Sequence, residues 1–185
     1  MERRGLLLLI RGFPGCGKST LARNLLRTPI GSKFVNLDPD AVRVARLDRR
    51  SLLNFEGEQI PEATLIYRFL LKRAKEELFC GINVLWDQPW RSLWGIRVTR
   101  NKLEESLGYF ELVILELFLP VSVAKQRMRK RISAGGHGPT DETFDRMVCE
   151  FEYAPTDEFR VVQLNALTDP HTLTRMIVEI LKKEL

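Results

Sequence analysis

A short glycine-containing stretch near the start of the chain has the residue types needed to bind phosphate groups. Residues 12–20 read Gly-Phe-Pro-Gly-Cys-Gly-Lys-Ser-Thr and fit the pattern G-x-x-x-x-G-K-[ST], the P-loop or Walker A motif. Its glycines let backbone N–H groups turn inward, and the following helix adds partial positive charge. The predicted nucleotide-binding residues are Gly12, Phe13, Pro14, Gly15, Cys16, Gly17, Lys18, Ser19 and Thr20. Among them, Lys18 would reach the β- and γ-phosphates, and Ser19 would bind Mg²⁺.

Cys16 lies inside this loop and has two interpretations. It is either a small residue that contributes only its backbone N–H, or a thiol activated by the helix N-terminus. We favour the first, because a P-loop needs only the backbone at this position.

Three aspartates follow predicted strands. Asp38 and Asp40 come after residues 34–37, and Asp87 comes after residues 82–86. In open α/β sheets, ligands bind where the strands end. Each aspartate could instead cap the next helix. We expect one of Asp38 and Asp40 to cap and the other to act in catalysis, and Asp87 to bind Mg²⁺ or an acceptor.

Two further segments carry candidate site residues. Trp90 and Arg91 follow Asp87 and could stack on or clamp an acceptor, although core packing is an equally good interpretation of Trp90. Arg127 and Arg131 are four residues apart, so they share one face of a basic helix. That helix leads into a glycine-rich stretch at residues 133–140, which is typical of a mobile lid spanning about residues 125–152. We expect His137 to be a lid contact rather than a catalytic group.

The elements that must position these residues alternate along the chain. Apolar strands are expected at 6–10, 34–37, 82–86, 112–119 and 161–164, and helices at 18–26, 41–47, 61–79, 92–107, 124–132, 141–152 and 169–185, with a loop at 48–60. Alternation of this kind favours a parallel sheet.

Composition sets further bounds. The 185 residues predict one domain, 1–185, and the net charge of +5 suits either a phosphate-handling enzyme or contact with nucleic acid. The three cysteines form no metal pattern and no disulfide framework, which favours a cytoplasmic protein. The first apolar run is too short to span a membrane. We expect no membrane association and no obligate protein partner.

With these features placed, the sequence resembles small P-loop kinases, in particular the AAA-type ATP-binding group that contains polynucleotide 5′-hydroxyl kinases, zeta-toxin-type kinases and chloramphenicol phosphotransferase. The stretch from Arg131 to Glu152 is also similar to the lid of gluconate-type kinases. The resemblance implies a three-layer α/β P-loop fold with a five-stranded parallel sheet of order 2-3-1-4-5 and a mobile helical lid. In polynucleotide kinases of this group, an Asp three residues before an Arg is the general base. Asp40 and Arg43 match that pair, and the lid arginine corresponds to Arg127 or Arg131.

The resemblance implies an ATP- and Mg²⁺-dependent phosphotransferase that acts on a hydroxyl. Asp38, Arg43, Asp87, Trp90 and Arg91 would contact the acceptor. The segment after Asp87 lacks the Thr-Asn-rich stretch of polynucleotide kinases, which favours a small-molecule or nucleoside-like acceptor over a polynucleotide 5′-end. The alternatives are a nucleotide-binding switch or NTPase that works through a partner, and a nucleic-acid-binding ATPase.

Overall fold

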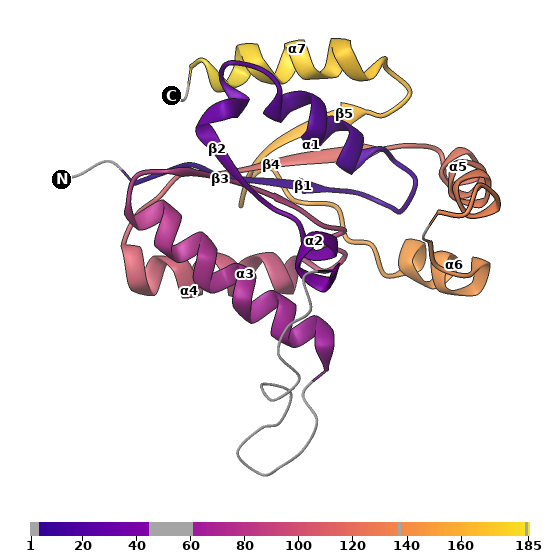
Figure 1. Ribbon diagram of the computed structural model, residues 1–185, viewed down its shortest axis with the longest axis horizontal. Coiled ribbons are helices and arrows are strands. Elements are labelled where there is room, and N and C mark those ends of the chain that lie inside the picture. The colour runs from indigo at the N-terminus through magenta and orange to yellow at the C-terminus, as the bar shows by residue number, and fades with distance from the viewer. Residues whose placement is uncertain (1–3, 45–60, 137, 184) are drawn as a thin grey trace.

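The computed structural model describes residues 4–44, 61–136, 138–183 and 185 (Figure 1). The predicted loop at 48–60 and His137 lie outside the described residues. The helices and strands are β1 (Leu7–Arg11), α1 (Lys18–Leu26), a 3-10 turn (Gly31–Lys33), β2 (Phe34–Leu37), α2 (Pro39–Val44), α3 (Glu62–Phe79), β3 (Asn83–Asp87), α4 (Leu93–Leu107), β4 (Leu112–Phe118), α5 (Val121–Ser133), α6 (Asp141–Cys149), β5 (Arg160–Asn165) and α7 (Pro170–Leu181).

The strands form one parallel sheet. Its order is β2-β3-β1-β4-β5, and every pair of neighbouring strands is parallel. β1 lies in the middle, with Leu9 paired to Trp86 of β3 on one side and to Ile114 of β4 on the other. The order 2-3-1-4-5 and the three-layer α/β class are therefore confirmed.

Helices cover both faces of the sheet. Figure 1 shows α1 and α7 on one face and α3 and α4 on the other. Successive residues of β1 point to opposite faces, so Leu8 and Ile10 join the core beneath α1 and α7, whereas Leu7 and Leu9 join the core beneath α3 and α4. All of these β1 side chains are fully buried, as expected for a strand covered on both sides.

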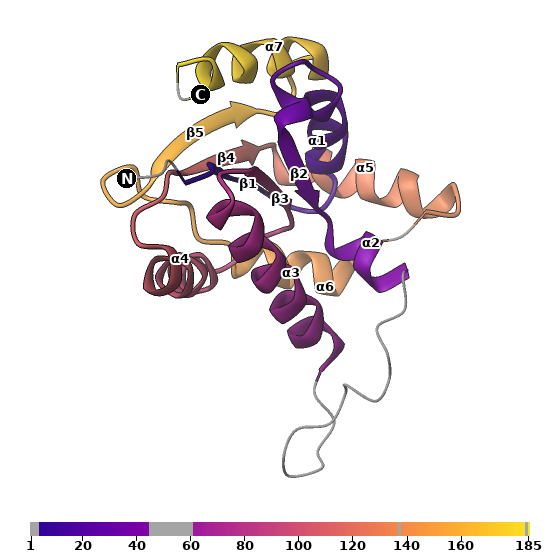
Figure 2. The same ribbon diagram turned by 60° about the vertical axis from the view of Figure 1, so that its left-hand side comes forward.

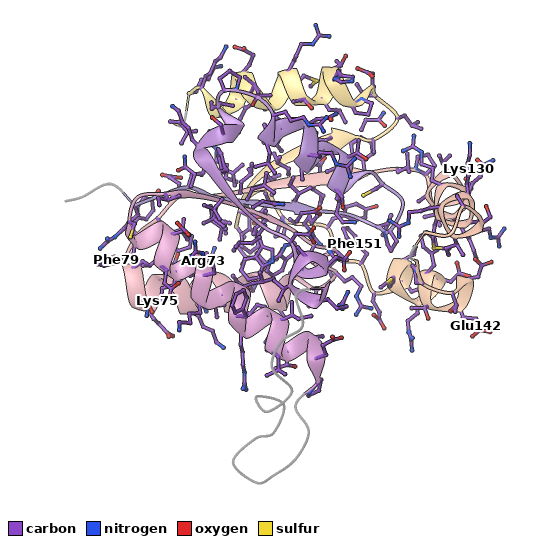
Figure 3. The ribbon with its side chains drawn as sticks, in the orientation of Figure 1. Arg73, Lys75, Phe79, Lys130, Glu142 and Phe151 are labelled. Atoms are coloured by element: carbon purple, nitrogen blue, oxygen red, sulfur yellow. The ribbon has the colours of Figure 1, made fainter. Side chains whose placement is uncertain are left out.

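Figure 1 shows α5 and α6 beyond the strand ends rather than over a face of the sheet. They form the predicted lid segment. Lys130 of α5 and Glu142 of α6 point outward from the molecule (Figure 3). Among the described residues, no helix combines the length and apolar character needed to cross a membrane.

The predicted boundaries differ from the observed ones by a few residues. α2 begins at Pro39 rather than at Ala41, which costs no hydrogen bond because the first helical N–H has no partner within the helix. α6 ends at Cys149 rather than at Glu152. The chain leaves the helix there because the backbone N–H of Glu152 donates to the carbonyl of Arg91 at 3.1 Å.

Candidate active site

The P-loop connects the central strand β1 to α1. Gly12, Gly15 and Gly17 all have positive φ. A Cβ at Gly15 would lie 2.4 Å from the carbonyl oxygen of Ala124, so the loop packs against α5 as only glycine allows. The Lys18 ammonium donates to the carbonyl oxygens of Gly12 and Phe13, each at 3.1 Å, and curls over the loop. The helix α1 begins at Lys18, and its first N–H groups have no partners within the helix.

Ser19 and Asp87 meet at the base of the loop. The Asp87 carboxylate is buried at the end of β3 and lines the same cavity as the Ser19 side chain. Burial raises the pKa of Asp87, Lys18 and Ser19 oppose that rise, and the nearby charges of Asp38 and Asp40 reinforce it. A buried carboxylate of this kind needs a cation beside it when it is ionised.

These oxygens suit Mg²⁺. The ion prefers oxygen ligands and binds through one or two protein groups together with substrate phosphates. Within the described residues, no group of three or more His, Cys, Asp and Glu side chains could cage a metal. A hydroxyl and one carboxylate beside a phosphate-binding loop therefore fit a metal that arrives with the nucleotide.

Asp38 and Asp40 take different roles at the start of α2. The Asp38 carboxylate accepts a hydrogen bond from the backbone N–H of Asp40 at 2.8 Å, so Asp38 caps the helix. The Asp40 carboxylate accepts from Arg43 at 2.7 Å, and its side chain is 76% exposed. Arg43 also lies 3.5 Å from Glu62 of α3. Asp40 is thus held by an arginine yet open to the cavity.

The basic helix α5 divides its charges between two faces. Lys125 binds Asp145 at 2.7 Å, and Arg129 binds Asp141, so these cations hold α5 to α6. Arg127 and Arg131 instead line a cavity next to the P-loop. Arg127 donates to the carbonyl of Ala166 at 3.2 Å. The spacing of four residues places both arginines on one face.

One cavity of about 800 Å³ collects most of the predicted site. The cavity is lined by residues of the P-loop, α1, the first turns of α2 and α3, the end of β3, the lid segment and the turn after β5. The predicted site residues that line it are Pro14, Gly15, Cys16, Gly17, Lys18, Ser19, Thr20, Asp38, Asp40, Arg43, Asp87, Arg127 and Arg131. Gly12 and Phe13 supply the carbonyl oxygens that hold Lys18.

Trp90 and Arg91 do not line this cavity. Trp90 has a φ of 46°, which turns its ring back against the core, where it packs edge-on against Trp86 at 5.0 Å between ring centroids. The Arg91 guanidinium pairs with Glu150 at 2.8 Å. The core interpretation of Trp90 describes its observed position, and both residues hold the segment after β3 to the segment after α6.

Cys16 is buried, with 1% of its surface exposed. Burial raises the pKa of its thiol, and the nearby Lys18 opposes this shift only in part. The geometry favours the interpretation in which the loop uses only the backbone of Cys16.

Arg11 was not predicted as a site residue, yet it holds the end of β1, directly before the P-loop, to neighbouring segments of the chain. Its buried guanidinium pairs with Glu116 of β4 at 2.8 Å and donates to the carbonyls of Trp90, at 2.8 Å, and Glu152. It also lies 4.4 Å from the ring centroid of Phe151, which is labelled near the centre of the molecule in Figure 3. The signal in the sequence is an arginine ending an otherwise apolar strand.

Tyr67 and the turn after β5 also line the cavity without having been predicted. Tyr67 faces the cavity from α3, and the turn contributes residues 166–170. A one-dimensional pattern could not identify them, because their part in the site depends on how α3 and α7 pack around the sheet.

Comparison with known proteins places this chain in a family. The sequence model described as "AAA domain" matches residues 7–154. The chain belongs to this family. The match runs from β1 through the P-loop, α2, β3 and the whole lid, so it covers each predicted site residue.

A curated guanylate kinase from Ruegeria pomeroyi is 28% identical over 161 residues, which cover 80% of this chain and 71% of that protein. Among solved structures, a protein of Chloroflexus aurantiacus that is provisionally assigned as a kinase matches with a TM-score of 0.71 and 15% identity, over 96% of this chain and 98% of the other. The Mycobacterium tuberculosis APS kinase matches with a TM-score of 0.59 and 15% identity, over 98% and 99%. The fold is thus that of P-loop kinases.

Proposed function

We propose that this protein is an ATP-dependent phosphotransferase that moves the γ-phosphate of ATP to a hydroxyl of an acceptor. The observation that supports this best is the single cavity lined by both a P-loop and the Asp40–Arg43 pair. A nucleotide switch has no need of an arginine-held carboxylate facing its phosphate site. The guanylate kinase and the APS kinase to which the chain is similar are also phosphotransferases by name.

Each residue then has a defined part. Lys18 and the P-loop N–H groups hold the phosphates, and Ser19 and Asp87 hold Mg²⁺, which neutralises charge on the phosphates when bound. Asp40 accepts the proton of the acceptor hydroxyl, and Arg43 keeps the carboxylate ionised and oriented. The lid places Arg127 and Arg131 against the transferring phosphoryl group and excludes water.

Phosphate transfer from γ-labelled ATP tests the proposal. The acceptor panel contains nucleosides, 5′-hydroxyl oligonucleotides, sugars and aryl alcohols, and we expect label in at least one alcohol. Asp40→Asn should lower kcat by about 10²- to 10⁴-fold with little change in ATP affinity, which is the contribution of a general base. Asp157→Asn, outside the cavity, is the control and should leave kcat unchanged.

The main alternative is an NTPase or nucleotide switch that works through a partner. This alternative predicts that the protein binds or hydrolyses ATP but transfers label to no alcohol. It also predicts that Asp40→Asn leaves ATP binding and hydrolysis unchanged. If Asp38→Asn rather than Asp40→Asn abolishes transfer, the base is Asp38.

A further inference from the structure

The end of the cavity farthest from α7 is formed by α2 and the first turns of α3. Both helices lie across the sheet from α7 in the two ribbon views (Figures 1 and 2). We call this the acceptor end and define it as Asp38, Asp40, Arg43, Ala63, Ile66 and Tyr67. It differs in charge and in shape from the phosphate end around the P-loop.

The acceptor end is electrically negative within the described part of the chain. It holds the carboxylates of Asp38 and Asp40, and the buried Asp87 lines the same cavity. Arg43 is the one cation in the defined set, and both Asp40 and Glu62 already pair with it. The net positive charge of the chain therefore does not extend to this end, and ATP would bring further negative charge next to it.

The acceptor end also has an apolar, flat wall. Tyr67 stacks on the buried Trp86, with the ring planes 28° apart and the centroids 6.0 Å apart. Thr99 donates its hydroxyl proton to the carbonyl of Gly95 at 2.8 Å, so the Tyr67 hydroxyl is the donor in its 3.0 Å bond to Thr99. Because the Tyr67 hydroxyl has its hydrogen-bond partner inside the protein, the ring is the part of Tyr67 that is left to line the cavity. Ile66 and Ala63 extend the apolar wall.

From this arrangement, and on the basis of the proposed phosphotransferase function, we infer that the acceptor is an alcohol without negative charge that lays a flat or apolar face on Tyr67. An anionic acceptor would meet several carboxylates and no unpaired cation at the described acceptor end. An uncharged alcohol can place its hydroxyl beside Asp40 and its apolar body against the ring.

Matched acceptors that differ only in charge test the inference. One pair is a nucleoside and its 3′-monophosphate, which carry the same 5′-hydroxyl and the same base. Another is an aryl-substituted diol and its carboxylated derivative. We expect kcat/KM for label transfer to be at least about 10-fold higher for the uncharged member of a pair. Added salt should lower the KM of any anionic member that reacts, because salt screens repulsion, and should leave the uncharged member unaffected.

Tyr67 variants test the flat wall. Tyr67→Phe keeps the ring and should leave the acceptor KM nearly unchanged. Tyr67→Ala should raise the acceptor KM by about 5- to 150-fold, the range for loss of one aromatic stacking partner, with the KM for ATP unchanged. If Tyr67→Ala does not fold, Tyr67→Leu fills much of the space against Trp86 without a flat face. Phe69→Ala is the control, since Phe69 lies on the same helix, is 49% exposed and does not line the cavity.

The outcomes separate this inference from the proposed function. Failure to label any alcohol of any class overturns the proposed function. Label that enters only anionic acceptors, or an anionic KM that rises with salt, leaves the phosphotransferase in place and overturns the inference. Equal acceptor KM values for Tyr67→Ala, Tyr67→Leu and the wild type overturn the part assigned to the ring.

Discussion

Arg11→Met should destabilise the protein far more than loss of any exposed arginine. Arg11 and Glu116 have side chains with 0% and 1% of their surface exposed. Among the residues that the structure describes, removing the guanidinium leaves the buried Glu116 carboxylate with only the backbone N–H of Ala154 as a hydrogen-bond donor, at 3.0 Å. It also removes a charged donor from the carbonyls of Trp90 and Glu152.

The size of the effect follows from these contacts. Breaking a buried ion pair by removing one partner typically costs about 3–5 kcal/mol, because the remaining charge has no compensation. The lost bonds to the two carbonyls are part of the same loss, so we take this range as the total. For a chain of this length, each kcal/mol lowers the melting temperature by about 2–4 °C. Arg11→Met should therefore lower it by about 6–20 °C.

Urea unfolding followed by tryptophan fluorescence measures the loss in the free energy of unfolding, and a thermal scan with the same signal measures the melting temperature. Trp86 and Trp90 report on both, because they are buried close to the network. The control is Arg97→Met, since Arg97 pairs with Glu158 but is 46% exposed. An exposed pair contributes about 0–1 kcal/mol. The double variant Arg11→Met/Glu116→Gln removes the stranded charge and keeps an acceptor for Ala154, so it should regain about 2 kcal/mol relative to Arg11→Met alone.

Two results would refute this reasoning. If Arg11→Met costs no more than Arg97→Met, the buried pair does not contribute as its geometry indicates. If the double variant is as unstable as Arg11→Met, the loss does not come from the isolated charge of Glu116.

Further predictions concern the cavity and its neighbours. Lys18→Ala should lower kcat by about 100-fold or more with an unchanged unfolding midpoint, because its charge acts mainly on the transition state; an unchanged kcat would contradict the P-loop assignment. Burial raises the pKa of Asp87 above 3.8, so between the unfolded and folded pKa values the folded state binds more protons and stability falls as pH rises. Asp87→Asn should therefore raise the melting temperature at neutral pH in EDTA while increasing the Mg²⁺ concentration needed for activity; a lower melting temperature would oppose this. Cys16 should react with iodoacetamide much more slowly than exposed Cys80 in the folded protein, since burial both covers the thiol and raises its pKa; mass spectrometry of the labelled peptides decides. Amides of residues 133–140 should gain hydrogen-exchange protection with a non-hydrolysable ATP analogue plus acceptor, and equal protection in both states would exclude a lid that closes.

The fold could be predicted because its signals are local. Alternating apolar strands and helices, with a P-loop after the first strand, predict a parallel sheet, and the resemblance to small kinases supplied its order. Sequence reasoning also predicted that one of Asp38 and Asp40 caps the helix, but a helix start predicted at Ala41 rather than at the observed Pro39 left open which one. The observed hydrogen bond from the Asp40 backbone N–H to Asp38 assigns the cap to Asp38.

What could not be predicted depends on contacts between distant segments. Trp90 follows Asp87 closely, yet a left-handed φ at Trp90 sends its ring into the core instead of the cavity. In the sequence, Arg11 is only the residue that follows a predicted strand. Its role depends on Glu116 of β4, which lies 105 positions further along the chain and is brought beside it by the fold. Tyr67 lies in the helix predicted at 61–79, but the packing of α3 against the sheet decides which residues of that helix line the cavity.

On the proposed function, the distribution of charge would let one cavity hold two substrates in a fixed order. Lys18, Arg127 and Arg131 lie where the phosphates are expected, whereas Asp38 and Asp40 lie beside α3. A nucleotide would be attracted to the first group and repelled by the second, so its γ-phosphate could point toward the acceptor end while its phosphates stay outside that end. The pairing of Lys125 and Arg129 with α6 leaves Arg127 and Arg131 as the α5 cations that line the cavity. If the predicted lid closes, these ion pairs would keep α5 and α6 together, and closure would bring both arginines to the phosphates together.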